Sequence, residues 1–226
     1  MSPARSSPLS LVGVFGGTFD PVHYGHLRSA LELVERLQLE QLRLMPSARP
    51  PHRTPPRCSA AHRATMVTLA VAGEPRLACD TRELSREGSS YTIDSLIELR
   101  AELGAHQGLC MVLGCDVVLD ITQWHRWREL LDFAHIVVIA RPGWQLPRTG
   151  EVAQWLAARR VQDLRRLRQQ PAGSIAIEEL RPLAISSTEI RELLAAGRSV
   201  RYLLPQTVLD YIQTHELYGH TQEDAT

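Results

Sequence analysis

The sequence predicts a single α/β domain in which a central parallel sheet is flanked by helices and a C-terminal helical segment packs against it. Short apolar runs alternate with amphipathic helical stretches, as in right-handed βαβ units, and the first run ends in a glycine-rich turn that leads directly into a helix. No Ser/Gly-rich linker divides the 226 residues, which suffice for one sizeable domain. We therefore expect one domain over residues 9–218, between disordered tails at 1–8 and 219–226.

The strands are predicted from short apolar runs rich in β-branched residues, because strands of a parallel sheet are buried on both faces. The first run, Leu9–Phe15, also ends in an aromatic residue. Strands are expected over Leu9–Phe15, Gln41–Met45, Arg76–Asp80, Leu109–Leu113, Ile136–Ala140 and Ser174–Ile177.

The helices are predicted from apolar residues at helical spacing next to capping or helix-ending residues. Ser59 and Thr92 are expected to cap helices, Gly197 to end one and Pro205 to start the last one. The first helix is expected to begin near Tyr24–His26 and to end at Leu37. Further helices are expected at Ser59–Ala72, Thr92–Leu103, Arg128–Phe133, Ile185–Gly197 and from Pro205 onward, and Glu151–Gln169 is expected to form one or two helices. A loop with five prolines, Pro46–Arg57, and a polar loop, Thr81–Ser90, separate the early elements.

The composition excludes several classes of function. The 25 basic residues balance the 25 acidic ones, so the charge favours neither a general nucleic-acid surface nor a membrane surface. All the basic residues are arginine, which excludes a phosphate-binding lysine of the Walker type and a Schiff base. Arginine and histidine must therefore bind any phosphate group. The arginines between Arg159 and Arg168 could contact nucleic acid, but a solvated helix face is the more common explanation.

The four cysteines form no CxxC pair, so we expect reduced thiols in a cytoplasmic protein and no zinc site. The first ten residues lack the apolar core of a signal peptide, and no apolar stretch approaches the roughly 20 residues that span a bilayer.

The segment Gly16–His26 has the composition of an anion-binding turn. Its two leading glycines let the backbone approach an anion closely, and Pro21 stiffens the turn. His23 and His26 share one face of the first turn of the next helix, whose N-terminus offers unpaired N–H groups and about half a positive charge. We interpret the segment as a phosphate-binding loop with two histidines; a glycine-rich turn with one capping histidine and no ligand is the alternative.

A second helix start, Ile185–Arg191, has similar properties. Its Ser-Ser-Thr run can cap the helix while hydroxyl and N–H groups face an anion, and Arg191 lies one turn further along. The same residues also fit a plain capping box ending at Glu189.

Asp116 follows the strand predicted at Leu109–Leu113. Open α/β sheets bind ligands at the carboxyl ends of their strands, so this carboxylate could face a ligand. It could equally cap the short helix that follows.

The string His23-Tyr24-Gly25-His26 resembles the HxGH signature of the nucleotidyltransferase superfamily, and the whole of Gly16–His26 resembles bacterial nicotinate-nucleotide adenylyltransferases. Other strings resemble segments of the same family: ISSTxIR at Ile185–Arg191, PPHR at Pro50–Arg53, REL and SYT at Arg82–Leu84 and Ser90–Thr92, and GxD at Gly114–Asp116. The resemblance runs from about Leu11 to Tyr218. Cys115 is a minor departure, and Arg148–Ala172 contains no motif that we can assign.

This resemblance implies a Rossmann-like fold and transfer of the adenylyl group of ATP to nicotinate mononucleotide, with Mg²⁺ arriving on ATP. The implied catalytic residues are His23, His26 and Arg191. The implied ATP- and phosphate-binding residues are Gly16, Gly17, Thr18, Phe19, Gly25, Asp116, Arg141, Ile185, Ser186, Ser187 and Thr188. The implied mononucleotide-binding residues are Asp20, His52, Arg53, Tyr91, Thr92 and Trp124, with Trp124 stacked on the pyridine ring.

Three alternatives stay open at this point. The acceptor could be nicotinamide mononucleotide or another phosphomonoester such as phosphopantetheine. A relative that binds nucleic acid without catalysis could use the same phosphate cradle, although the zero net charge argues against it. The sequence does not decide between a monomer and a small homo-oligomer.

Overall fold

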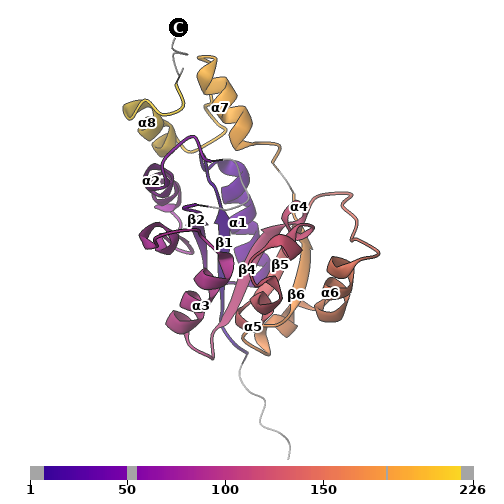
Figure 1. Cartoon of the computed structure of the whole chain (residues 1–226). Coiled ribbons are helices and arrows are strands. Elements are labelled where there is room, and N and C mark those ends of the chain that lie inside the picture. Colours follow the sequence, from indigo (N-terminus) through magenta and orange to yellow (C-terminus); the bar gives the residue numbers. More distant parts are fainter. Residues whose placement is uncertain (1–7, 50–54, 182, 220–226) are drawn as a thin grey trace, which may run out of the picture.

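The computed structural model describes residues 8–49, 55–181 and 183–219 as an α/β fold built on one six-stranded parallel sheet (Figure 1). The strands are β1 Leu11–Gly17, β2 Gln41–Pro46, β3 Leu77–Cys79, β4 Gly108–Gly114, β5 His135–Ala140 and β6 Ile175–Glu179. Their order across the sheet is β3-β2-β1-β4-β5-β6, so the direction of winding reverses between β1 and β4. The crevice at such a switch point is where open α/β sheets bind ligands.

Helices cover both faces of the sheet and its carboxyl edge. The α-helices are α1 Tyr24–Leu37, α2 Ala60–Val71, α3 Thr92–Leu103, α4 Cys115–Val118, α5 Leu130–Phe133, α6 Glu151–Arg159, α7 Ser187–Ala195 and α8 Gln206–Thr214. Short 3-10 helices lie at η1 Arg82–Ser85, η2 Ile121–Gln123, η3 Trp127–Glu129 and η4 Leu164–Arg168. Figure 1 shows α7 and α8 above the end of the sheet that lies opposite the N-terminal tail.

The core consists of two clusters, one on each face of the sheet. Along β4, Cys110 and Val112 belong to the cluster that contains residues of α1, α2 and α8, whereas Met111 belongs to the cluster formed with α3 and α5. This alternation is the two-residue period of a strand buried on both faces. The apolar runs in the sequence therefore correspond to fully covered strands, and the predicted fold class is confirmed.

Most predicted elements are found with shifted ends. The first strand begins two residues later than expected and continues through both glycines to Gly17. Thr92 does not cap α3; the N-cap is Tyr91, whose side chain forms no capping hydrogen bond, and Thr92 is the first helical residue. Asp116 is likewise not an N-cap, because Gly114 holds that position before α4. The expectation for Ser59 is confirmed, since its side chain accepts a hydrogen bond from the His62 amide.

Three predicted segments contain a short 3-10 turn, and the division of Glu151–Gln169 agrees with the prediction of one or two helices there. The polar loop Thr81–Ser90 contains η1, and the helix predicted at Arg128–Phe133 is a 3-10 turn followed by the single turn α5. The segment Glu151–Gln169 divides into α6 and η4. Gly197 ends α7 as predicted, with a left-handed φ of 66° one residue beyond the C-cap.

Arginine side chains fasten loops at the amino end of the sheet. Arg100 donates to the carbonyl groups of Gly104, Gln107, Phe133 and Pro171. Arg168 donates to carbonyl groups before β1 and at the end of α1. At least this member of the arginine cluster is thus structural, and the solvated face expected for the cluster does not describe it.

All four cysteines are free thiols. In residues 8–49, 55–181 and 183–219, no helix combines the length and apolar character that crossing a membrane requires. The same ranges contain no cluster of three or more His, Cys, Asp or Glu that could hold a metal ion. The predicted tails fall almost entirely outside these ranges, so the domain limits stay a prediction.

Candidate active site

Three adjoining cavities lie at the carboxyl end of the sheet, around the switch point between β1 and β4. One of about 600 Å³ lies between the start of α1 and the start of α7, and one of about 810 Å³ lies beside the loop after β1. They share Phe15, His26, Gly114 and Ser187, so they form one groove. The third, of about 140 Å³, shares Gly16, Gly17 and Thr18 with this groove. The loop after β1 therefore separates two connected spaces.

The chain around the loop after β1 packs so closely that the glycines at its two ends, Gly17 of β1 and Gly25 of α1, have little room for a side chain. A Cβ on Gly17 would lie 2.8 Å from the ring of Phe19, which is buried beneath the loop and has a left-handed φ of 50°. A Cβ on Gly25 would lie 2.9 Å from the ring of His23 and 3.4 Å from the carbonyl oxygen of Ile185. Glycine at these positions lets the two helix starts and the histidine ring approach one another.

His23 and His26 form a stacked pair that opens onto the groove. Their ring centroids are 3.8 Å apart with an angle of 30° between the planes, and Phe19 packs edge-on against His26 at 5.0 Å. His23 is 5% exposed and is the N-cap residue of α1, although its side chain forms no capping hydrogen bond. The buried Nδ1 atom of each ring has no hydrogen-bond partner in the described part of the chain.

Burial keeps both rings neutral at physiological pH. Desolvation lowers the pKa of His23 to about 4. Desolvation and then the charge of His23 lower the pKa of His26 to about 3. The pair therefore offers N–H hydrogen-bond donors, and the positive character of the site comes from helix N-termini and arginine instead.

The start of α7 is joined to the loop after β1 by hydrogen bonds. Ser186 caps α7 by accepting from the Glu189 amide, so the capping interaction that the sequence suggests is present. Ser187 Oγ donates to the Pro21 carbonyl at 2.9 Å, and Arg191 Nη1 donates to the Asp20 carbonyl at 2.7 Å. These bonds bring the two predicted phosphate segments, far apart in the sequence, to opposite sides of one groove.

Thr188 and Asp20 are partly engaged within the protein. Thr188 Oγ1 accepts from Arg191, and its residue lines a neighbouring cavity rather than the groove. Asp20 is 5% exposed, and its carboxylate accepts from the Arg57 amide at 2.8 Å and from the Tyr218 hydroxyl at 2.7 Å. Burial and this carboxylate raise the pKa of Tyr218, which keeps the phenol protonated. The Asp20 side chain thus ties the C-terminal segment to the loop, and Asp20 also lines the groove, so its role in binding the mononucleotide stays a prediction.

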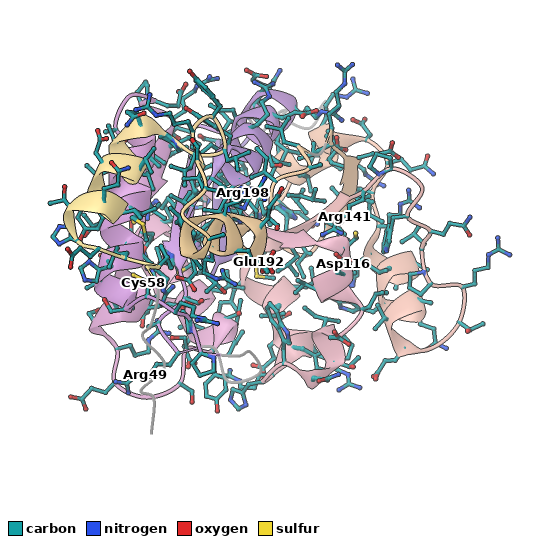
Figure 2. All side chains as sticks on the ribbon, turned by 90° about the horizontal axis from the view of Figure 1, so that it is seen from above. Arg49, Cys58, Asp116, Arg141, Glu192 and Arg198 are labelled. Atoms are coloured by element: carbon teal, nitrogen blue, oxygen red, sulfur yellow. The ribbon has the colours of Figure 1, made fainter. Side chains whose placement is uncertain are left out.

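Asp116 and Arg141 lie just beyond the carboxyl ends of β4 and β5 and line the groove, and Figure 2 shows them close together and well apart from Cys58. Arg141 Nη2 is 3.0 Å from Asp116 Oδ2, and both side chains are well exposed. This pair gives the groove one exposed cation and one exposed carboxylate, and water screens their attraction.

The 140 Å³ cavity is lined by three of the residues that were predicted to bind the mononucleotide. Tyr91, Thr92 and Trp124 all line it, and the Tyr91 ring packs against His125 at 4.6 Å. Its other walls include Met45 and Met111, which makes it an apolar slot closed on one side by the loop after β1. His52 and Arg53, predicted to bind the mononucleotide phosphate, lie outside the described residues.

Sequence reasoning missed several residues around these cavities. Glu83 lines the aromatic cavity, and burial raises the pKa of its carboxyl group. Arg57 lines the groove beside Asp20. Arg63 lies fully buried beneath the loop; its place beside the apolar stripe residues Met66 and Val67 is the signal that could have revealed it.

Comparison with known proteins places the chain in a family. The family model described as Cytidylyltransferase-like matches residues 14–193. A protein of Pseudomonas putida (strain W619) named "Probable nicotinate-nucleotide adenylyltransferase" is 51% identical over 215 residues, which are 95% of this chain and 98% of that protein. A protein of the same name from Pseudomonas aeruginosa (strain UCBPP-PA14) is 52% identical over 207 residues, covering 92% and 96% of the two chains.

A solved structure shares the fold at much lower sequence identity. Plasmodium falciparum nicotinic acid mononucleotide adenylyltransferase complexed with NaAD superposes with a TM-score of 0.70 at 18% identity, covering 92% of this chain and 97% of that one. The two Pseudomonas relatives match this chain over almost the whole of both sequences, with about half of the aligned residues identical. The chain therefore belongs to the nicotinate-nucleotide adenylyltransferase family, within the cytidylyltransferase-like nucleotidyltransferases.

Proposed function

We propose that this chain transfers the adenylyl group of ATP to nicotinate mononucleotide, giving nicotinate adenine dinucleotide and pyrophosphate for NAD biosynthesis. The observation that carries the proposal is the connection of two unlike spaces across the loop after β1: an aromatic slot and a groove with a helix N-terminus on each side. A pyridine ring suits the slot, and a triphosphate suits the groove. Their shared edge, Gly16–Thr18, is where the two phosphate groups would meet.

The reaction needs orientation and charge stabilisation more than it needs a base. A phosphate monoester has a second pKa near 6, so at pH 7 the attacking phosphate is mostly a dianion already. The barrier lies in bringing two polyanions together and in the charge that grows on the α-phosphoryl group and the departing pyrophosphate. Fixed N–H donors and helix N-termini meet this demand.

We assign His23 and His26 to the triphosphate as neutral hydrogen-bond donors. Each ring packs against another ring, which favours a fixed orientation, so little reorganisation is needed when charge develops. An anion beside them would favour the protonated ring and raise both pKa values above those of the free protein. At pH 7 the rings stay neutral donors, and their hydrogen bonds strengthen as the acceptor oxygens gain negative charge.

The start of α7 completes the phosphate cradle. Ser186 and Ser187 line the groove opposite the histidines, and Arg191 supplies a cation at its edge. The contact of Arg191 with the Asp20 carbonyl holds its guanidinium in place before ATP arrives. We expect Arg141 to reach the phosphates or the ribose from the other side, since it is largely exposed and can change rotamer.

The aromatic slot accounts for recognition of the mononucleotide. We propose that Trp124 stacks on the pyridine ring and that backbone N–H groups at Tyr91 and Thr92, where α3 starts, take the nicotinate carboxylate. Nicotinamide offers an uncharged amide in place of that carboxylate, so the helix start should favour the acid.

We propose that Mg²⁺ accompanies ATP and is held mainly by phosphate oxygens and water. The groove offers few free carboxylates to a metal, because Asp20 is engaged by Arg57 and Tyr218 and Asp116 pairs with Arg141. Few protein ligands and several waters suit Mg²⁺, which would neutralise charge on the phosphates. The four free thiols support a cytoplasmic location.

The experiment that tests the proposal is pyrophosphate release from ATP and Mg²⁺ with nicotinate mononucleotide, nicotinamide mononucleotide or phosphopantetheine as acceptor. A strong preference for nicotinate mononucleotide is the expected result. Preference for nicotinamide mononucleotide would keep the reaction and reject the carboxylate site at α3. Release with neither pyridine nucleotide would reject the substrate.

A further inference from the structure

Arg63 is a buried arginine that joins three separate backbone segments beneath the candidate active site. Its side chain is 1% exposed, and each nitrogen of its guanidinium donates to a backbone carbonyl. Nη1 donates to Thr18 at 2.6 Å, Nη2 to Ser47 at 2.7 Å and Nε to Cys58 at 3.2 Å. The ring of acceptors thus comes from the ends of β1 and β2 and from the residues that precede α2.

The three acceptors are the points that fix the active-site loops. Thr18 belongs to the loop that separates the two cavities, and Ser47 lines the aromatic slot. Ser47 also donates from its amide to the Gly17 carbonyl at 2.9 Å, so the ends of β1 and β2 are already paired. Ser47 and Cys58 lie at the two ends of the proline-rich segment. One guanidinium therefore holds that segment at both ends and holds the phosphate loop at its centre.

The charge of Arg63 has no carboxylate partner among the ion pairs in the described part of the chain, and backbone carbonyl oxygens alone receive its hydrogen bonds. Burial lowers the pKa of Arg63, and the charge of Asp20 opposes that shift. An arginine remains protonated even so, since its ordinary pKa is above about 12. Keeping a buried cation without a carboxylate is costly, so this place in the fold calls for an explanation.

We propose that Arg63 is a positioning residue for the adenylyl transfer, an inference that rests on the proposed function. By drawing the carbonyl of Thr18 inward, it turns the neighbouring peptide groups so that their N–H groups face the shared edge of the two cavities. It also places a fixed positive charge behind that edge, where two phosphate groups must approach each other. Arg63 contacts neither substrate; it acts through Thr18 and Ser47.

Arg100 supplies a matched control. It is also a partly buried arginine whose pKa burial lowers, and it also donates only to backbone carbonyls. Its acceptors lie at the amino end of the sheet, away from the cavities. If a carbonyl-binding arginine merely stabilises the fold, loss of Arg63 and loss of Arg100 should have the same consequences.

The test compares Arg63→Lys, Arg63→Met and Arg100→Met in the full chain. Steady-state pyrophosphate release gives kcat and KM for both substrates, thermal unfolding gives Tm, and amide hydrogen exchange reports on residues 16–20 and 45–48. We expect both Arg63 variants to lower kcat by about 100-fold, the usual effect of misplacing reacting groups by about 1 Å. Exchange should rise in those two segments. Arg63→Lys keeps the charge but cannot bind three carbonyls at once, so it should fall close to Arg63→Met.

Arg100→Met should lower Tm while kcat stays within about threefold of the parent value, and its extra exchange should lie at residues 104–108. Equal kcat losses for Arg63 and Arg100 variants of similar Tm, or normal kcat in Arg63→Lys, would overturn the proposal. If the parent protein released no pyrophosphate, the proposed function would have failed, and hydrogen exchange would still decide whether Arg63 orders the two loops.

Discussion

Replacing Gly25 by alanine should impair catalysis while leaving the fold intact. Helix propensity favours alanine over glycine by about 1 kcal/mol in a helix interior, and Gly25 lies in the first turn of α1 without a positive φ. Against this, the new Cβ would lie 2.9 Å from the His23 ring and 3.4 Å from the Ile185 carbonyl. The ring must therefore move by several tenths of an ångström, and its stacking on His26 must change.

The two effects act on different observables. The higher helix propensity of alanine raises the free energy of unfolding, and the crowding at the His23 ring lowers it. We therefore expect a net change of less than about 1 kcal/mol. The displaced donor acts only on the transition state, and losing one such donor typically lowers turnover by about 100-fold or more.

The assay is kcat for pyrophosphate release, measured beside unfolding by denaturant. Gly73→Ala is the matched control, because a Cβ at Gly73 would meet no atom within 4 Å. Gly73→Ala should keep its kcat. If Gly25→Ala also kept a normal kcat, the close approach of His23 to the helix start would have no catalytic meaning.

Three further predictions follow from the same contacts. Because His23 and His26 titrate near pH 4 and 3 in the folded chain but near 6.5 when unfolded, the unfolded state binds more protons below pH 6.5 and stability is lost as pH falls. The loss of unfolding free energy should approach about 1.4 kcal/mol per pH unit for each ring. When the unfolding free energy from denaturant titrations is plotted against pH, His26→Ala should show a shallower slope than the parent protein, and an equal slope would contradict the burial of His26. Tyr218→Phe removes the hydroxyl that donates to Asp20, and we expect a loss of about 1–3 kcal/mol in unfolding free energy, measured by denaturant titration; an unchanged midpoint would show that this bond does not hold the C-terminal segment. Arg191→Ala should raise KM for ATP at least several-fold with little change in KM for the mononucleotide, and unchanged kinetics would remove Arg191 from the phosphate cradle.

Local patterns were enough to predict the fold and the approximate place of the site. Apolar runs predicted the strands because both faces of the sheet are covered, and glycines after β1 predicted the loop at its carboxyl end. Strand order 3-2-1-4-5-6 then brings that loop beside the end of β4 and the start of α7. The strand order brings the parts of the groove together, and no short stretch of the sequence reveals that order.

The parts that could not be predicted depend on contacts between distant residues. The bond between Tyr218 and Asp20 joins positions 198 apart in the sequence, and nothing near either residue indicates it. The neutrality of the histidines follows from their burial, to which the packing of Phe19 against His26 contributes, and sequence spacing does not show this burial. Arg63 resembles any helical arginine until the three carbonyl groups around it are known.

The proposed mechanism depends most on the neutral, buried histidines, which donate hydrogen bonds to the reacting phosphates. The most direct test is kcat of His26→Ala for pyrophosphate release from ATP and nicotinate mononucleotide, with folding verified by thermal unfolding. We predict that a folded His26→Ala loses about 100-fold or more in kcat, the usual effect of removing a transition-state donor. A folded variant with near-normal kcat would contradict the claim and move the source of catalysis to the helix N-termini and arginines alone.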